Sequence, residues 1–328
     1  MFDFLLERGL PAAVLDALLN SPSKIAGSLE HASMEKARQT HVSLDRELPA
    51  GYPPTTRCYA LLIGVNHYDD NPLDGCINDV QAMQDFLISH YHFSASDVVT
   101  MTDNSPLLLP TRSNILRQLH DMVRNAQEGD SLTIYYAGHG TRYSESIYTT
   151  VSSMEEDVVD AICPLDRGKI VDGEMVMDIT NRDLCEILSE ARANVTLVLD
   201  CCHGGSFIDV QNCRSGKVRY ANPLLAMGRT LFQRNPTARI HHNGTVAPYV
   251  LLQACQSFQV AFEGCPGNSP THGNFTRALV DALKVDVERT MSYKDLLSHI
   301  GPLPLQTPVL CGDGYADRLW GACDIMEK

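Results

Sequence analysis

Two turns flanked by glycines each carry a residue that can do nucleophilic chemistry. His139 follows the largely apolar residues 131–137, and Cys202 follows the apolar residues 195–199. A thiol is a poor nucleophile until it is ionised, and a nearby imidazole can accept its proton. The backbone amides of Gly140 and Cys202 can donate to a developing oxyanion, an interaction often worth ~3 kcal/mol. The pattern predicts a dyad with His139 as general base and Cys202 as nucleophile.

Each member of this dyad also has a plainer explanation. Taken alone, His139 is explained as a turn residue and Cys202 as a buried thiol. Two such turns, each after a strand-like run, are harder to explain by packing alone. A dyad further requires that both turns lie at the same edge of one sheet, because a thiol and an imidazole must meet to share a proton.

Strand-like and helix-like patterns alternate along the chain from residue 58 onward. The predicted strands are 58–65, 97–101, 131–137, 195–199, 250–252 and 308–311. The predicted helices are 78–90, 115–122 with a cap at 111–114, 183–193, 274–283 and 293–300. This alternation predicts an α/β fold, with a mostly parallel six-stranded sheet and helices on both faces. Chemistry in such sheets lies beyond the carboxyl ends of the strands.

Composition excludes several classes of partner. The 328 residues include 26 Lys and Arg against 40 Asp and Glu, a net charge of −14. This balance argues against nucleic acid or an anionic membrane as a partner, since both require a dominant basic face. We find no run long and apolar enough for a membrane span and no basic segment typical of a secretory signal at the start.

The cysteines are odd in number and dispersed. There are 11 of them, and no two form a Cys-x-x-Cys pair. A disulfide scaffold and a structural zinc site are therefore not expected. We expect a cytoplasmic protein with reduced, mostly buried thiols.

Four segments differ in composition and pattern. Residues 1–50 are predicted to be a helical appendage and linker, and residues 51–210 a larger region that carries the dyad. Residues 211–247 are predicted to be a basic linker, and residues 248–328 a smaller region that completes the sheet.

Several short motifs in a fixed order resemble one peptidase family. They are residues 59–66, Asp-Gly-Cys-Ile-Asn-Asp at 74–79, Tyr-Ala-Gly-His-Gly at 136–140, Asp-Cys-Cys-His-Gly-Gly at 200–205, and segments 251–255, 273–279 and 306–308. Together they resemble the caspase-domain cysteine peptidases, and the metacaspases more closely. The resemblance implies a caspase-like three-layer sandwich, a cysteine endopeptidase that acts on proteins or peptides, and a monomer.

Cys255 competes with Cys202 for the role of nucleophile. The segment Gln253-Ala-Cys255-Gln256 imitates the animal caspase signature, in which Gly follows, whereas Ser257 stands here. That signature expects its histidine ~50 residues upstream, and Cys202 lies nearer to His139 than Cys255 does. We interpret Cys202 as the nucleophile and Cys255 as a buried thiol at a strand end.

The resemblance also implies a specificity. In metacaspases the carboxylates that match Asp79 and Asp200 line an acidic pocket for Arg or Lys. Ala137 stands where the family often has Ser, and loss of one neutral hydrogen bond costs ~1 kcal/mol. Alternatively, Asp79 is only a carboxylate that favours a helix N-terminus. Cleavage after Asp remains a second alternative, with Arg142 as the nearest candidate cation.

The segment after the dyad is basic in an otherwise acidic chain. Residues 211–262 contain no Asp or Glu. We interpret this segment as a self-cleavage linker, with candidate sites at Arg214, Lys217, Arg219 and Arg229. A solvated loop, or a patch for an acidic partner, is the alternative.

Calcium is a further implication of the resemblance. Asp209 matches one family position for a calcium ligand, and Asp157, Asp160 and Asp183 are further candidates that are otherwise plain surface acids. Calcium would be an activator, since the dyad chemistry needs no cofactor. A different class of function also stays open, namely a catalytically silent caspase-like module that binds partners through residues 1–50.

Overall fold

A computed structural model describes residues 56–144, 158–202, 217–221, 249–257, 259–265, 267, 269–286, 289–301, 303–312 and 319–320. All of them fall in the compact unit Thr55–Lys328. The predicted appendage at residues 1–50 and most of the predicted linker 211–247 lie outside the described residues. The segment boundaries predicted above therefore stay predictions.

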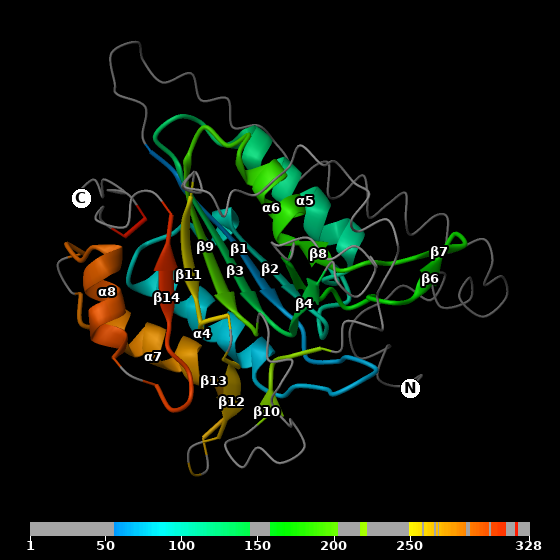
Figure 1. Ribbon diagram of the computed structural model, residues 1–328. Coiled ribbons are helices and arrows are strands. Elements are labelled where there is room, and N and C mark those ends of the chain that lie inside the picture. The colour runs from blue at the N-terminus through cyan, green and yellow to red at the C-terminus, as the bar shows by residue number, and fades with distance from the viewer. Residues whose placement is uncertain are drawn as a thin grey trace, which may run out of the picture. The chain divides into compact units, whose positions relative to one another are not determined.

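A six-stranded sheet forms the centre of the fold (Figure 1). Its strand order is β14-β11-β9-β3-β1-β2, and each pair is parallel except β11 with β14. The strands are β1 Cys58–Gly64, β2 Val98–Thr102, β3 Ser131–Ala137, β9 Asn194–Asp200, β11 Val250–Gln253 and β14 Val309–Cys311. All six predicted strands are found, so the predicted mostly parallel sheet is confirmed.

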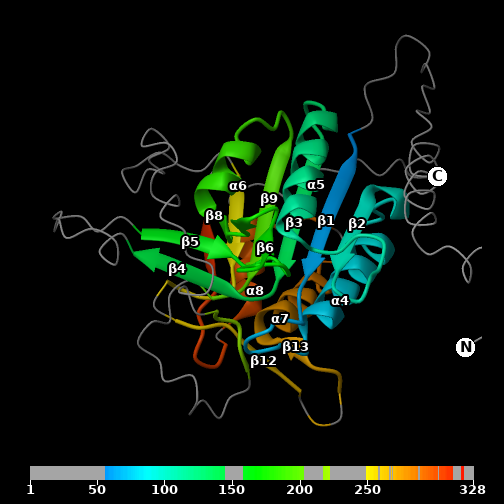
Figure 2. The same cartoon turned by 90° about the vertical axis from the view of Figure 1, so that its right-hand side faces the viewer.

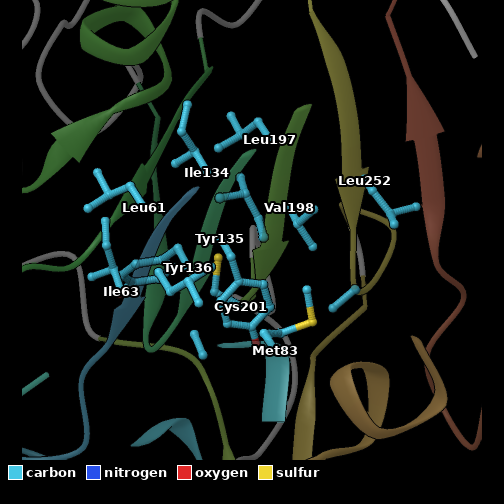
Figure 3. Packing of buried hydrophobic residues seen from close by; sticks show 14 of the residues in the cluster. Leu61, Ile63, Met83, Ile134, Tyr135, Tyr136, Leu197, Val198, Cys201 and Leu252 are labelled. Atoms are coloured by element: carbon cyan, nitrogen blue, oxygen red, sulfur yellow. The ribbon is translucent and has the colours of Figure 1, made fainter. Parts of the chain in front are cut away.

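The central strands are apolar because both of their faces are covered. All seven residues of β3 are buried, including the charge-free run from Leu132 to Ala137. Tyr135 and Tyr136 of this strand lie in the packed interior together with Leu61, Val198 and Leu252 from other strands of the sheet (Figure 3). Continuous apolar runs of this kind are typical of strands in parallel sheets.

Within the described residues, five helices cover the two faces of the sheet (Figures 1 and 2). Helices α5 and α6 lie on one face, and α4, α7 and α8 on the other. Their bounds are α4 Cys76–Ser89, α5 Arg112–Asn125, α6 Asn181–Leu188, α7 Asn274–Leu283 and α8 Tyr293–Ile300; a short 3-10 turn η1 spans Ala95–Asp97. The three-layer α/β arrangement expected from the sequence is confirmed.

Local signals explain where the helices begin and end. Thr111 caps α5, as predicted, since its side chain accepts the N–H of Asn114 at 3.3 Å. The predicted helix 183–193 is wrong at its end, because α6 stops at Leu188. Beyond that point the N–H groups of Glu190 and Ala191 bond three residues back, which tightens the chain into a turn before β9.

Three small sheets were not predicted, because strands of two to five residues carry too little periodicity to be recognised. One contains β4 Gly140–Ser144, β5 Val158–Ile162 and β8 Ile179–Thr180; the second contains β10 Lys217–Val218, β12 Phe262–Gly264 and β13 His272–Gly273; the third is the hairpin β6 Ile170–Val171 and β7 Glu174–Met175. The sheet of β10, β12 and β13 lies beyond the carboxyl ends of the central strands (Figure 1).

Two further expectations concern membranes and thiols. Within the described residues, none of the helices has the length and hydropathy needed to cross a bilayer. Eight of the described cysteines are free, whereas Cys58 is disulfide-bonded. The reduced state that we expected for the thiols is therefore wrong at Cys58.

Candidate active site

The parallel pairing of β3 with β9 brings the two predicted turns to one edge of the sheet. Ala137 and Asp200 are partners in this register, and His139 and Cys202 each lie two residues further along. Both side chains are fully buried. The prediction that His139 and Cys202 share a sheet edge therefore agrees with the structure.

His139 is held as a neutral base with one free acceptor. Its Nε2 lies 2.6 Å from the carbonyl oxygen of Asn71, and a carbonyl only accepts, so Nε2 carries the proton. Nδ1 is then unprotonated, and it has no hydrogen-bond partner in the described part of the chain. Burial lowers the pKa of His139 to about 4. Two tyrosines fix its backbone: Tyr68 Oη accepts the N–H of His139 at 3.0 Å, and Tyr136 Oη donates to its carbonyl at 2.7 Å.

Asn71 is a functional residue that the sequence analysis missed. Its backbone has a φ of 57°, in the left-handed region that Asn tolerates better than most residues. This conformation accompanies the carbonyl contact with His139 Nε2. The dipeptide Asn71-Pro72 was the available signal, since Asn-Pro pairs mark turns.

The thiol of Cys202 is turned toward the backbone of Ala261. Cys202 Sγ accepts the N–H of Ala261 at 2.9 Å and lies 3.5 Å from its carbonyl oxygen. Burial, together with the adjacent thiol of Cys255, raises the pKa of Cys202. Cys202 is thus a neutral thiol here. Cys255 is itself buried just after β11, near the Gln259 carbonyl, as expected of a strand-end thiol.

The two turns converge on one oxygen, the carbonyl of Arg219. The N–H groups of Gly140 and Cys202 donate to it at 3.0 and 3.2 Å. These are the two amides that the sequence analysis assigned to an oxyanion. A side chain at position 140 is not tolerated, because a Cβ there would lie 2.0 Å from the carbonyl oxygen of Cys202.

The side chain of Arg219 is buried among three carboxylates, which we call the acidic pocket. Its Nη1 lies 3.0 Å from Asp200 Oδ2, and its Nη2 lies 2.5 Å from Asp79 Oδ2 and 3.4 Å from Glu263 Oε2. Asp79 and Asp200 were predicted to line one pocket, and the structure brings them together. Glu263 was missed, although it is the first acidic residue after the acid-free residues 211–262.

Each predicted carboxylate of the pocket is held by other contacts. Asp79 accepts the N–H of Gly273 and lies 3.0 Å from His272 Nδ1, while it also occupies the first turn of α4. Asp200 Oδ2 accepts the N–H and hydroxyl of Thr276 at 3.1 and 2.6 Å. Burial raises the pKa of Asp200 to about 6, and the charge of Arg219 opposes this rise. Asp79 is thus both a helix N-terminal carboxylate and a pocket residue.

Two further predicted residues lie apart from the guanidinium contacts. Ala137 is buried beside Asp200 in the β3–β9 register and adds only a methyl group. Arg142, the candidate cation for binding an acidic side chain, pairs with Asp160 instead, with Nε 2.7 Å from Oδ1. No described contact joins Arg142 to the acidic pocket.

Two of the four predicted calcium ligands, Asp160 and Asp183, are described, and each is engaged with an arginine. Asp160 is paired with Arg142, and Asp183 caps α6 and lies 3.5 Å from Arg112. Over the described residues, no three His, Cys, Asp or Glu side chains form a group that could hold a metal. Asp157 and Asp209 lie outside the described residues.

Of the four predicted self-cleavage positions, too, two lie within the described residues and two lie outside them. Arg214 and Arg229 lie outside the described residues. Lys217 is half-exposed and pairs with Asp74, whereas Arg219 fills the acidic pocket. Of the two described candidates, Arg219 is the one whose carbonyl oxygen lies between the Gly140 and Cys202 amides.

Comparisons with known proteins match the region that contains His139 and Cys202. Residues 59–211 match the family model "Metacaspase, peptidase C14 domain". The chain is 38% identical to Metacaspase-1 of Eremothecium gossypii over 165 residues, which is 48% of this chain and 34% of that protein. It is 38% identical to Metacaspase-1B of Aspergillus fumigatus over 179 residues, which is 52% of this chain and 41% of that protein. The matches thus span less than half of these relatives.

The fold also resembles a solved structure. Protein GSU0716 from Geobacter sulfurreducens superposes with a TM-score of 0.55 at 19% sequence identity, over 77% of this chain and 92% of that one. At this identity the likeness concerns the fold alone.

Proposed function

Since residues 59–211 match the family model of the metacaspase, peptidase C14 domain, we propose that the protein is a cysteine endopeptidase of this family that cleaves after Arg or Lys and also cleaves itself. Its dyad is His139 and Cys202. Its first self-cleavage site is the bond between Arg219 and Tyr220.

One observation carries this proposal: Arg219 makes the contacts expected of the substrate residue whose peptide bond is cleaved. Its carbonyl oxygen accepts two converging amides, and its side chain fills the acidic pocket. The backbone on both sides is held as well, since Arg219 donates to the Ala261 carbonyl and Ala221 donates to the Gly140 carbonyl, each at 3.0 Å. A carbonyl so held is polarised toward the charge that develops on its oxygen during attack.

The chemistry follows from these positions. The proton of Cys202 passes to Nδ1 of His139, and the thiolate attacks the carbonyl carbon of Arg219. The amides of Gly140 and Cys202 stabilise the oxyanion. His139 then donates the proton to the nitrogen of Tyr220, which leaves as a free amine, and water hydrolyses the thioester on Cys202. Asn71 keeps the imidazole oriented through Nε2.

The first step requires a small rearrangement. Cys202 Sγ now bonds to Ala261, while His139 Nδ1 has no hydrogen-bond partner among the described residues. The proposal requires that rotation of the thiol away from Ala261 bring it within reach of the imidazole. Both groups are neutral before this rotation, because burial raises the thiol pKa and lowers the imidazole pKa. We infer that the uncut chain is latent and that this rotation starts turnover.

Mass spectrometry of the purified protein tests the self-cleavage. We expect a cut between Arg219 and Tyr220 that is absent from Cys202→Ala and retained in Cys255→Ala. Arg219→Gln should abolish this cut while cuts at other basic residues remain possible. Equal loss in the two cysteine variants, or an active protein with this bond intact, contradicts the proposal.

Fluorogenic peptides that differ only in the residue before the leaving group test the specificity. We expect cleavage after Arg, weaker cleavage after Lys, and none after Asp. The acidic pocket repels a carboxylate, and Arg142 is engaged with Asp160. Cleavage after Asp and not after Arg would overturn the assignment of the pocket.

A catalytically silent partner-binding module is the second candidate, and the position of the Cys202 thiol is the observation that favours it. A thiol bonded to Ala261 beside a filled pocket is also what an inactive relative would have. A thiol-reactive probe with an arginine-containing peptide separates the two, since only an enzyme labels selectively at Cys202.

Calcium activation stays a proposal that rests on the family alone. The described candidates Asp160 and Asp183 are engaged with arginines, so we assign calcium no step in the reaction. The peptide assay repeated with calcium and with a chelator tests it, and equal rates refute it. The cytoplasmic location and the monomeric state likewise stay predictions.

A further inference from the structure

The residues that precede Arg219 lie along β12 as a bound peptide would. Strand β10 pairs antiparallel with β12, with Lys217 opposite Glu263 and Val218 opposite Phe262. Asn71 Nδ2 approaches the carbonyl oxygen of Val218 at 3.5 Å, and Val218 is buried. The backbone register therefore sets where the side chain of Lys217 can reach.

Lys217 meets two oxygens on the loop between β1 and α4. Its Nζ lies 2.6 Å from Asp74 Oδ2 and 3.0 Å from the carbonyl oxygen of Pro72. An ammonium has three donors, so it can satisfy both acceptors and still contact water. Lys217 therefore has two oxygen partners on this loop, whereas a single exposed ion pair would give it one.

The loop between β1 and α4 presents negative charge to Lys217. The backbone N–H of Asp74 donates to Glu263 Oε1 at 2.7 Å. The buried carboxylate of Glu263 therefore also holds the backbone of Asp74, whose side chain contacts Lys217. The loop carries three exposed carboxylates, Asp69, Asp70 and Asp74, and between residues 65 and 76 it has no Lys or Arg. The local potential is therefore negative where Lys217 lies.

We propose that Asp74 and the Pro72 carbonyl form a binding subsite for a basic side chain two residues before the arginine at the cleaved bond. The protein substrates then carry Lys or Arg, one intervening residue, and Arg, as Lys217-Val218-Arg219 does in this chain. This inference rests on the proposed peptidase function and extends it to a second position of the substrate.

Three fluorogenic peptides that differ at one position test the subsite. They are Lys-Val-Arg, Gln-Val-Arg and Glu-Val-Arg with the same leaving group, assayed on the full chain. We expect kcat/KM to fall in that order by about two- to fivefold per step, the range for one partly exposed charge contact. The differences should shrink in 0.5 M salt, because exposed charges are screened.

Variants of the loop separate the subsite from the general charge of the surface. Asp74→Asn should bring the three peptides to similar kcat/KM, and Asp74→Lys should reverse their order. Asp70→Asn is the matched control on the same loop and should leave the order unchanged. Within the chain itself, Lys217→Glu should slow self-cleavage, and addition of Asp74→Lys should restore it.

The possible failures are distinguishable. If the three peptides are cleaved equally well, the subsite is refuted while cleavage after Arg stands. If Asp70→Asn acts as strongly as Asp74→Asn, the preference belongs to the whole loop and the assigned subsite is wrong. If no Arg peptide is cleaved at all, the proposed function fails and the inference fails with it.

Discussion

Arg219 is the residue around which the site is organised, because a buried charge must be paired. Three carboxylates approach one guanidinium, and all four groups are buried. Loss of one partner of such a pair is strongly destabilising, by roughly 3–5 kcal/mol, since it leaves an uncompensated buried charge. The planar guanidinium reaches Asp200 and Asp79 through separate nitrogens, which an ammonium cannot do equally well. We therefore predict that the pocket favours Arg over Lys.

The pH dependence of self-cleavage should report Asp200. Its pKa is raised by burial from its usual value near 3.8 to about 6, so it gains a proton as the pH falls through 6 and no longer pairs with arginine. We expect the first-order rate of self-cleavage to fall toward tenfold per pH unit below about 6. His139 does not cause this fall, because its pKa of about 4 keeps it neutral in this range.

The control for this profile is Asp200→Asn. This variant should cleave after Arg slowly at every pH and lack the inflection near 6. A wild-type rate that stays constant from pH 7 to pH 5 is incompatible with a role for this carboxylate.

Glu263→Gln tests the third carboxylate of the pocket. The amide keeps an acceptor for the N–H of Asp74 but removes the charge that faces Arg219. A charge-assisted hydrogen bond contributes about 1.5 kcal/mol at the low end, so kcat/KM for Arg peptides should fall about tenfold. An unchanged kcat/KM would show that Asp79 and Asp200 suffice.

At the scale of elements, the small sheet β10–β12–β13 positions as much of the site as the central sheet does. The central strands carry His139, Asp200 and Cys202 to one edge, whereas β12 and β13 close the acidic pocket from the other side. Gly273 lies at this closure, and a Cβ there would be 2.2 Å from Asp200 Oδ2 and 2.8 Å from Arg219 Nη1. Position 273 must therefore be glycine for the pocket to hold an arginine.

Gly273→Ala should abolish cleavage after Arg219, because the added methyl group displaces Asp200 or the guanidinium. Gly264→Ala is the matched control in the neighbouring strand β12, since a Cβ there meets nothing closer than Asn274 Oδ1 at 3.6 Å. The measurement is the extent of self-cleavage, with circular dichroism to check folding. Similar losses in both variants would contradict this steric argument.

At the scale of the molecule, the proposed cleavage point divides the chain within one continuous sheet. The strands β11 and β14 come after Arg219, yet β11 pairs with β9, which comes before it. Helices α7 and α8 also follow the cleavage point and cover the face of the sheet on which α4 lies (Figure 1). The two parts therefore share one apolar core.

The cleaved protein should stay assembled. Separation of the two parts would expose the apolar strands and helix faces that now form the core, at ~25 cal/mol for each Å². We expect both fragments to elute together in size-exclusion chromatography under native conditions and apart in denaturant. Elution as two species under native conditions would show that only the uncut peptide bond, and not the shared core, had joined the two parts.

The sequence by itself determined the sheet, most of the helices and the meeting of His139 with Cys202 at one edge. Apolar runs and helix caps are local signals, and parallel strands necessarily bring their carboxyl ends together. The motif order also pointed to the metacaspase family, and Asp79 and Asp200 followed from that resemblance.

The tertiary structure alone decided which basic residue enters the pocket, and that Asn71 and Glu263 complete the site. These contacts join residues 68 to 189 positions apart, and most of these residues lie in loops or in strands of two or three residues, which have no periodicity. Pairing over such distances depends on the folded surface around each group and leaves no pattern in the neighbouring sequence. For the same reason the orientation of the Cys202 thiol toward Ala261 could not be predicted from the sequence.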